Sequence, residues 1–426
     1  MPDRSYLYSG EESWNAGEQK DLCWNGGLCL REDCFTGCWL GPVQAFADLD
    51  RLALSWNAAV PLGAGVRVSA RVQVDGAWTP WLDWGLWSPL CDAHRLPPKL
   101  AACAGARLRD GVLCLDKAAE AFQLQAELTA NDVGESPLLY LLAASPMAAV
   151  GLAPDEGEPL YHRCIPVPAY SQQTRDPRLA GRIGGAVCAT MLMNRWGEDL
   201  LPEKVAHSCR DWAGSWEDPA YLAATVSLYG YEALAVHCGV AALKKEIKSG
   251  CASAALLGGA SPRWVVVRGF DTDADQVQQV LLNDPDADSD TAAETVMDLA
   301  DFTAAWTGLA LLVHPKDEAK APCAPGRGVG ELRPSELPGA WTLLRKGERV
   351  SLPVDLCVQG GVCRGTVCYT VKDGRAYASN AHKRFFYTDV SAAGDILLDT
   401  AAMPAGTHLS VYVIQPEQTT AACLTL

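Results

Sequence analysis

Residues 168–285 contain, in order, an amide, a thiol, a cation and a carboxylate, each in a distinctive local sequence. They are Gln172 in Pro-Ala-Tyr-Ser-Gln, Cys188 in Gly-Gly-Ala-Val-Cys, Arg263 in Pro-Arg-Trp-Val-Val-Val-Arg-Gly-Phe, and Asp284 in Asn-Asp-Pro. A thiol hydrolase needs a cysteine at a helix N-terminus, where the helix dipole favours the thiolate. It also needs an amide donor for the oxyanion, and a base that is oriented by a carboxylate or amide.

This ordered set resembles a bacterial group of cysteine peptidases in the papain-like superfamily. The group is the "family thirty-nine-like" branch, which is similar to the double-glycine peptidases. In that branch Pro-x-Tyr-Ser-Gln, Gly-Gly-x-x-Cys, a strand that begins with His and runs Val-Val-Val-x-Gly-Phe-Asp, and Asn-Asp-Pro occur in this order. The resemblance covers residues 160–316. It extends to Ser55-Trp-Asn-Ala58 and to the segment Trp78–Trp87, which look like the β-sandwich that precedes the peptidase-like domain in some of these proteins.

The resemblance implies a role for three of the four residues. Gln172 is expected to bind the oxyanion, Cys188 to be the nucleophile, and Asp284 to orient the base. Each residue also has an ordinary structural interpretation. Gln173 is a rival to Gln172, the thiol of Cys188 fits a buried core position, and Asp284 before Pro285 is typical of a turn.

Two departures from the family pattern weaken the expectation of catalysis. The family's histidine position holds Arg263, and a guanidinium cannot accept a proton at any usable pH. General acid–base catalysis contributes ~10²–10⁴-fold, so we expect a weakened or inactive peptidase that could retain peptide binding. The helix from Cys188 to Gly197 is also about one turn (3.6 residues) shorter than the family's, which leaves the placing of Cys188 open. Among the histidines of the domain, His237 is the nearest substitute base by sequence.

The surrounding sequence predicts a multidomain chain with a central α+β papain-like fold between two β-sandwich domains. Period-two alternation over 65–74 and 121–128, with a hairpin turn at Asp75-Gly76, indicates a β-sandwich over 21–147, after a flexible N-terminus over 1–20. Helical and strand patterns alternate over 160–316, and strand patterns return in a C-terminal β-sandwich over 325–426. The expected helices of the central domain are 201–212, 218–228 and 240–248. The expected strands there are 231–236, 252–257, 264–270, 277–282 and 309–314.

Composition limits the partners. The chain has 426 residues and a formal net charge of −16, which argues against nucleic acid. No apolar run is long enough for a membrane span. No signal peptide precedes the first domain, so the 17 cysteines are expected to be reduced thiols of a cytoplasmic protein. The family resemblance implies a peptide or protein as the ligand, and neither a cofactor nor a metal is expected.

A rival hypothesis is a non-catalytic protein that binds carbohydrate or protein through a β-sandwich. Tryptophans recur at every third position over 78–87, and Trp81 and Trp84 would be the binding residues if this segment formed a stacking platform. The favoured interpretation of this spacing is that the four tryptophans are core and rim residues of the β-sandwich. The sequences Cys-Trp-Asn-Gly-Gly-Leu-Cys (23–29) and Cys-Val-Gln-Gly-Gly-Val-Cys (357–363) also resemble each other, and related hairpins and coincidence both remain open.

Overall fold

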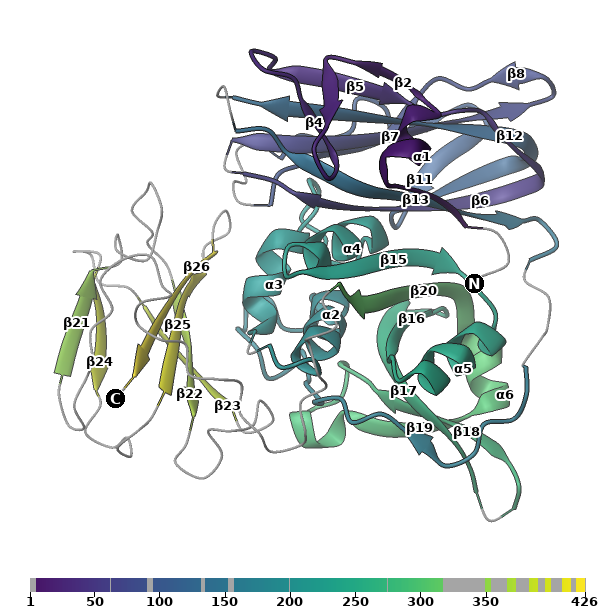
Figure 1. The fold of residues 1–426 in the computed structure, drawn as a ribbon. Coiled ribbons are helices and arrows are strands. Elements are labelled where there is room, and N and C mark those ends of the chain that lie inside the picture. Colours follow the sequence, from purple (N-terminus) through teal and green to yellow (C-terminus); the bar gives the residue numbers. More distant parts are fainter. Residues whose placement is uncertain are drawn as a thin grey trace.

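The computed structural model describes residues 5–316, apart from residues 62, 90–94, 132–134, 152–156, 199 and 274. After residue 316 it describes the backbone of six strands between residues 349 and 425. Figure 1 shows an N-terminal sheet region that lies against a central α+β region. The described part of the chain is mostly β-sheet, and its helices other than the short α1 (Glu11–Asn15) lie in the central region.

The N-terminal region is one antiparallel sheet of 13 strands. Its longest strands, β6 and β12, contact each other over the first half of β12, and β12 then pairs with β7 over its second half. Between β7 and β8, Asp75 (φ 51°) and Gly76 (φ 76°) form the hairpin turn that the sequence predicts. The strands are β1 (Tyr6–Ser9), β2 (Glu18–Lys20), β3 (Leu22–Trp24), β4 (Leu28–Leu30), β5 (Thr36–Leu40), β6 (Gln44–Ala59), β7 (Ala64–Val74), β8 (Ala77–Trp78), β9 (Leu82–Trp87), β10 (Ala102–Cys103), β11 (Ala106–Arg109), β12 (Val112–Ala130) and β13 (Leu138–Ala148).

Residues 6–20 differ from the expected flexible terminus. Strand β1 pairs with β13, and the short helix α1 (Glu11–Asn15) follows it. Trp14 of this helix is fully buried and makes an edge-on ring contact with Trp39 at 4.9 Å between centroids. The buried ring holds the terminus on the sheet, and polar composition alone could not indicate this.

The central region is an antiparallel sheet in the order β15-β20-β16-β17-β18-β19, with β14 paired to β17. In Figure 1, α2, α3 and α4 group together at one side of this sheet, and α5 and α6 lie at the other. The strands are β14 (Arg163–Cys164), β15 (Tyr231–His237), β16 (Ser253–Leu257), β17 (Arg263–Thr272), β18 (Gln278–Asn283), β19 (Glu294–Asp298) and β20 (Trp306–Pro315). The helices are α2 (Gly184–Asn194), α3 (Pro202–Cys209), α4 (Pro219–Ser227), α5 (Val240–Ser249) and α6 (Leu299–Ala305), with a 3₁₀ turn at Asp290–Ala292.

The two regions meet at β15, which is the first strand in the order of the central sheet and would otherwise leave backbone groups unpaired. Side chains of the N-terminal sheet hydrogen-bond to it. Asn57 donates to the carbonyl of Ala233 at 2.7 Å and accepts from the same residue's N–H at 3.0 Å. Ser145 accepts from the N–H of His237 at 2.8 Å. Polar side chains of β6 and β13 therefore complete the edge of the central sheet.

Helix α4 begins where the N-terminal and central regions meet. Asp218 caps the N-terminus of this helix by accepting hydrogen bonds from the N–H groups of Ala220 and Tyr221. Burial raises the pKa of Asp218 to about 7, and the charge of Asp211 adds to this, although the two N–H groups act in the opposite direction. The folded state therefore holds a proton that the unfolded state loses above its ordinary pKa near 3.8. Stability contributed by this group is complete below pH 3.8 and is lost as pH rises to about 7.

We expect Asp218→Asn to raise the free energy of unfolding at pH 8 by on the order of 2–3 kcal/mol relative to wild type. Asparagine keeps the cap, because Asn and Asp are comparable at this position, and it removes the buried charge. Urea denaturation at pH 3.8 and pH 8 measures the effect, and the advantage of the variant should be confined to the higher pH. An equal effect at both pH values would contradict the assignment.

The C-terminal segment contains strands where the sequence predicts them. They form a two-stranded sheet and a four-stranded sheet, both antiparallel. The six are β21 (Arg349–Pro353), β22 (Thr366–Lys372), β23 (Lys383–Asp389), β24 (Asp395–Asp399), β25 (His408–Ile414) and β26 (Thr419–Thr425). The repeated Cys-Gly-Gly-Cys sequence at 357–363 lies outside the described residues.

Candidate functional site

Helix α2 begins at Gly184, four residues before the cysteine that was expected at its N-terminus. Cys188 lies one turn inside the helix, and its exposed fraction is 0%. Burial raises the pKa of the Cys188 thiol well above its ordinary value, and the nearby carboxylate of Glu217 raises it further. In this environment the sulfur stays protonated and is shielded from a substrate.

Gln172 lies directly in front of the first turn of α2. Its side-chain carbonyl accepts from the N–H of Ile183 at 2.9 Å, and its side-chain amide donates to Asp286. Its backbone N–H donates to the carbonyl of Pro285 at 2.8 Å. These bonds hold the Gln172 amide between the start of α2 and the Asn-Asp-Pro loop.

Arg263 and Asp284 form an ion pair, with 3.0 Å between Nε and Oδ2. Arg263 begins β17 and Asp284 follows the last residue of β18, so the antiparallel pairing of the two strands brings them to the same end of the sheet. The other carboxylate oxygen of Asp284 accepts from the N–H of Asp286 at 3.0 Å. The structure therefore brings Arg263, Asp284 and the loop that contains Gln172 together at this end of the sheet.

Glu217 is a member of this site that sequence reasoning missed. Its carboxylate accepts from the N–H of Gly185 at 3.0 and 3.2 Å, in the first turn of α2. Burial raises the pKa of Glu217 to about 7, against the effect of the Gly185 hydrogen bond, and the charge of Asp286 adds to the rise. Glu217 comes from the loop before α4, and nothing in its local sequence indicates the contact. A carboxylate of this chain thus occupies the anion-favouring end of α2.

Position 184 is the point where these groups converge. A Cβ atom placed on Gly184 would lie 3.5 Å from the Gln172 amide nitrogen, 3.7 Å from a Glu217 carboxylate oxygen and 3.7 Å from Pro285. A side chain here would start at the helix N-terminus, beside the amide expected to bind an oxyanion. Glycine supplies only backbone at this position.

The two glycines that begin α2 differ in the space around them, which yields a matched prediction. Contacts of 3.5–3.7 Å are ordinary at Gly184, whereas a Cβ on Gly185 would meet Leu222 at 2.9 Å and the carbonyl of Trp216 at 3.1 Å. We expect Gly184→Ala to be neutral or to stabilise by about 0.4–1 kcal/mol, and Gly185→Ala to cost about 1–3 kcal/mol. Chemical denaturation of the two variants measures this, and equal costs would contradict the described packing.

The other residues considered from sequence lie apart from this site. Trp84 is 2% exposed and donates its indole N–H to the carbonyl of Gly111, which leaves little of its ring for a ligand. Trp81 is half-buried and stacks on the guanidinium of Arg71 at 4.7 Å. His237 is buried in the contact between the two regions, where burial lowers its pKa to about 4. Its ring nitrogen bonds to Ser145, so His237 has a structural role.

Among the described residues, no helix is both long enough and apolar enough to span a membrane.

Comparisons with known proteins match the two regions separately. Residues 31–145 match the family described as the Peptidase C39 N-terminal domain, and residues 164–311 match the Peptidase_C39 like family. A comparison with curated proteins gives no match.

Two solved structures are similar to part of the chain. The peptidase domain of Streptococcus ComA, a bi-functional ABC transporter involved in a quorum sensing pathway, is 15% identical, with a TM-score of 0.28 over 36% of this chain and 100% of that chain. The peptidase domain of Streptococcus mutans ComA is 16% identical, with a TM-score of 0.24 over 35% of this chain and 99% of that one. These scores are too low to support an argument. The two family matches lie in the order that the sequence motifs predict, and they show that the chain is similar to C39-like cysteine peptidases over residues 31–145 and 164–311.

Proposed function

We propose that residues 160–316 form a papain-like domain that binds peptide without hydrolysing it, between β-sandwich domains at 21–147 and 325–426. The observation that carries the proposal is Gly184. It lies at the helix N-terminus beside the Gln172 amide, where a nucleophile would be needed, and it has no side chain.

The chemistry of the neighbouring residues supports this proposal. The thiol of Cys188 is buried and has a raised pKa, so it is a poor nucleophile. Arg263 pairs with Asp284 and cannot shuttle a proton to a leaving amine. At pH values above its raised pKa of about 7, Glu217 places a negative charge against the first turn of α2, where it would repel a developing oxyanion. Each of these features opposes hydrolysis and leaves binding possible.

Arg263 is the residue proposed to contact the peptide. One of its five N–H groups bonds to Asp284, and its side chain is 33% exposed. The terminal nitrogens of a guanidinium donate to carbonyl or carboxylate oxygens. Because Asp284 fixes the Arg263 side chain in place, these donors are ordered before a peptide arrives, which lowers the entropic cost of binding.

Fluorescence polarisation with a fluorescein-labelled pool of peptides of mixed sequence tests the binding. We expect Arg263→Met to weaken it about tenfold or more, since a hydrogen bond to a charged group contributes about 1.5–3 kcal/mol. Arg268→Met is the matched control, because Arg268 lies on the same strand and pairs with Glu294. Mass spectrometry of the same peptides should show no cleavage. Cleavage that disappears in Cys188→Ala would overturn the proposal in favour of a working peptidase.

A further inference from the structure

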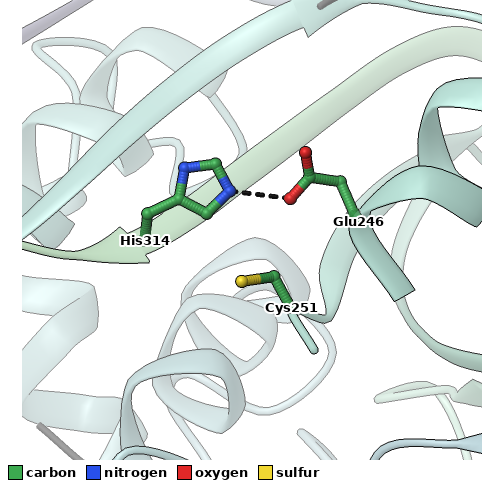
Figure 2. Close-up of side chains that lie close together, drawn as sticks. All are labelled: Glu246, Cys251 and His314. Atoms are coloured by element: carbon green, nitrogen blue, oxygen red, sulfur yellow. Dashed lines mark hydrogen bonds and ion pairs between the residues drawn. The ribbon is translucent and has the colours of Figure 1, made fainter. Parts of the chain in front are cut away.

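Three side chains of types that can bind metal ions meet at the end of the central sheet away from the Gly184 site. They are Glu246, Cys251 and His314, and their ligand atoms all lie within 4.8 Å of one another. Figure 2 shows the three side chains converging, with His314 Nε2 bonded to a Glu246 carboxylate oxygen at 2.7 Å. All three residues are half-buried, so an ion could reach them from solvent.

The C-terminal turn of α5 places two of these side chains together. Gly250 adopts the left-handed conformation at φ 88°, its N–H donates to the carbonyl of Ile247, and the N–H of Cys251 donates to the carbonyl of Glu246. These two bonds define a Schellman motif, in which the chain folds back over the last helical turn. Cys251 is therefore held beside Glu246 by backbone geometry that glycine permits.

Strand β20 supplies the third side chain. His314 is the next-to-last residue of this strand and lies opposite Glu232 of β15. The register places Leu257 opposite both Trp306 and Arg263, so Arg263 lies level with the other end of β20. Trp306 and His314 are separated by about 26 Å of strand at ~3.3 Å per residue. The cluster is thus separate from the Gly184 site.

The donor atoms are a sulfur, an imidazole nitrogen and a carboxylate oxygen, a set that zinc binds in proteins. Zinc bonds of about 2.0–2.3 Å in a tetrahedron place donor atoms about 3.3–3.7 Å apart. The His314 nitrogen and the Glu246 oxygen lie 2.7 Å apart and no pair of ligand atoms is more than 4.8 Å apart, so shifts of about 1 Å would reach this geometry. A thiolate and a carboxylate also match the charge of a divalent ion.

Two charged neighbours act on the cluster in opposite senses. Arg195 donates to the carbonyl of Gly250 at 2.7 Å, and its positive charge acts on Cys251. Glu232, opposite His314 in the sheet, contributes a negative charge. The positive charge of Arg195 and the negative charge of Glu232 therefore offset each other near the three candidate ligands.

We propose that Glu246, Cys251 and His314 bind one zinc ion, with water as the fourth ligand. The ion replaces the hydrogen bond between Glu246 and His314 and ties the C-terminal end of α5 to β20. This site serves the fold of the domain and is independent of peptide binding.

Titration of the reduced full-length protein with Co²⁺ and then Zn²⁺ tests the site. We expect one cobalt per chain, with a thiolate-to-cobalt charge-transfer absorption band that zinc abolishes by displacement. Cys251→Ser should eliminate the band, and His314→Gln should lower the affinity at least tenfold. Circular dichroism of both variants shows whether the fold is retained, and Glu246→Gln provides a third variant should either fail to fold.

Two control variants replace cysteines that lie outside the proposed zinc site. Cys164→Ser removes an exposed thiol, and Cys23→Ser with Cys29→Ser removes a pair whose sulfurs lie 3.3 Å apart. Both controls should keep the full cobalt band. The proposal is overturned if no band forms, if the band survives both Cys251→Ser and His314→Gln, or if it vanishes in the Cys23 and Cys29 double variant instead.

Discussion

Replacing Asp83 by Leu is expected to lower the free energy of unfolding by about 3–5 kcal/mol, because it strands a buried charge. Asp83 is 2% exposed and pairs with Arg67, which is 5% exposed. The same carboxylate accepts from the N–H groups of Gly85, Lys99 and Leu100 at 2.7–3.1 Å. The variant therefore leaves the buried guanidinium of Arg67 without its carboxylate partner and three backbone donors without an acceptor.

A double-mutant cycle separates the two contributions. Adding Arg67→Met to Asp83→Leu removes the stranded cation, so the double variant should be less destabilised than the sum of the single variants by about 1–3 kcal/mol. It should remain below wild type, because the three backbone N–H groups stay unpaired. Urea denaturation measures all four proteins.

The exposed Arg107–Asp116 pair provides the control for this cycle. Its side chains are 47% and 56% exposed, so Asp116→Asn should change stability by only about 0–1 kcal/mol. A similar cost for Asp83→Leu and Asp116→Asn would contradict the buried position of Asp83.

Restoring a nucleophile and a base together is expected to create thiol chemistry at the Gly184 site. In Gly184→Cys with Arg263→His, the new thiol lies at the N-terminus of α2 beside the Gln172 amide, and the imidazole lies next to Asp284. The double variant should react with a peptide vinyl sulfone at position 184 about 10²-fold faster than Gly184→Cys alone, which is the low end of general acid–base catalysis. Mass spectrometry of the labelled peptide gives the site and the rate.

The single variants show whether the nucleophile belongs at position 188 or at position 184. If Cys188 is the nucleophile, Arg263→His alone should gain reactivity, and the label should appear on Cys188. If position 184 is the relevant one, Arg263→His alone should stay unreactive, as wild type should. Cys164, which is exposed, reports the background alkylation rate of an accessible thiol in the same chain. Labelling of Cys188 at a rate above this background would contradict the proposed site.

Local sequence was sufficient for elements whose signals are local. The Asp75-Gly76 turn, the strand that follows Ala64, and helices α4 and α5 were predicted close to their observed bounds, since each has a clear period or a capping residue. The expectation that Gln172, Arg263 and Asp284 share a site came from the family resemblance of the motifs that contain them. Adjacent antiparallel strands bring the ends of β17 and β18 together whatever the rest of the fold does.

The start of α2 could not be predicted locally. Gly184 and Gly185 are poor helix formers, so propensity alone places the start of the helix later, near Cys188. In the structure, Gln172 accepts the N–H of Ile183 and Glu217 accepts that of Gly185, and these distant side chains satisfy the first donors of the helix. Tertiary contacts therefore moved the helix start by four residues and changed which residue faces the site.

The sequence by itself determined the similarity to C39-like peptidases and the alternation of strands and helices, and it led us to expect Arg263 at the position of the catalytic base. Only the tertiary structure decided that Cys188 is buried, that Glu217 occupies the end of α2, and that Glu246, Cys251 and His314 meet. The physical reason is the range of the interactions involved. Periodicity and turn chemistry act between neighbouring residues and leave a pattern in the sequence. Burial and side-chain convergence arise between segments that become neighbours only when the sheet forms.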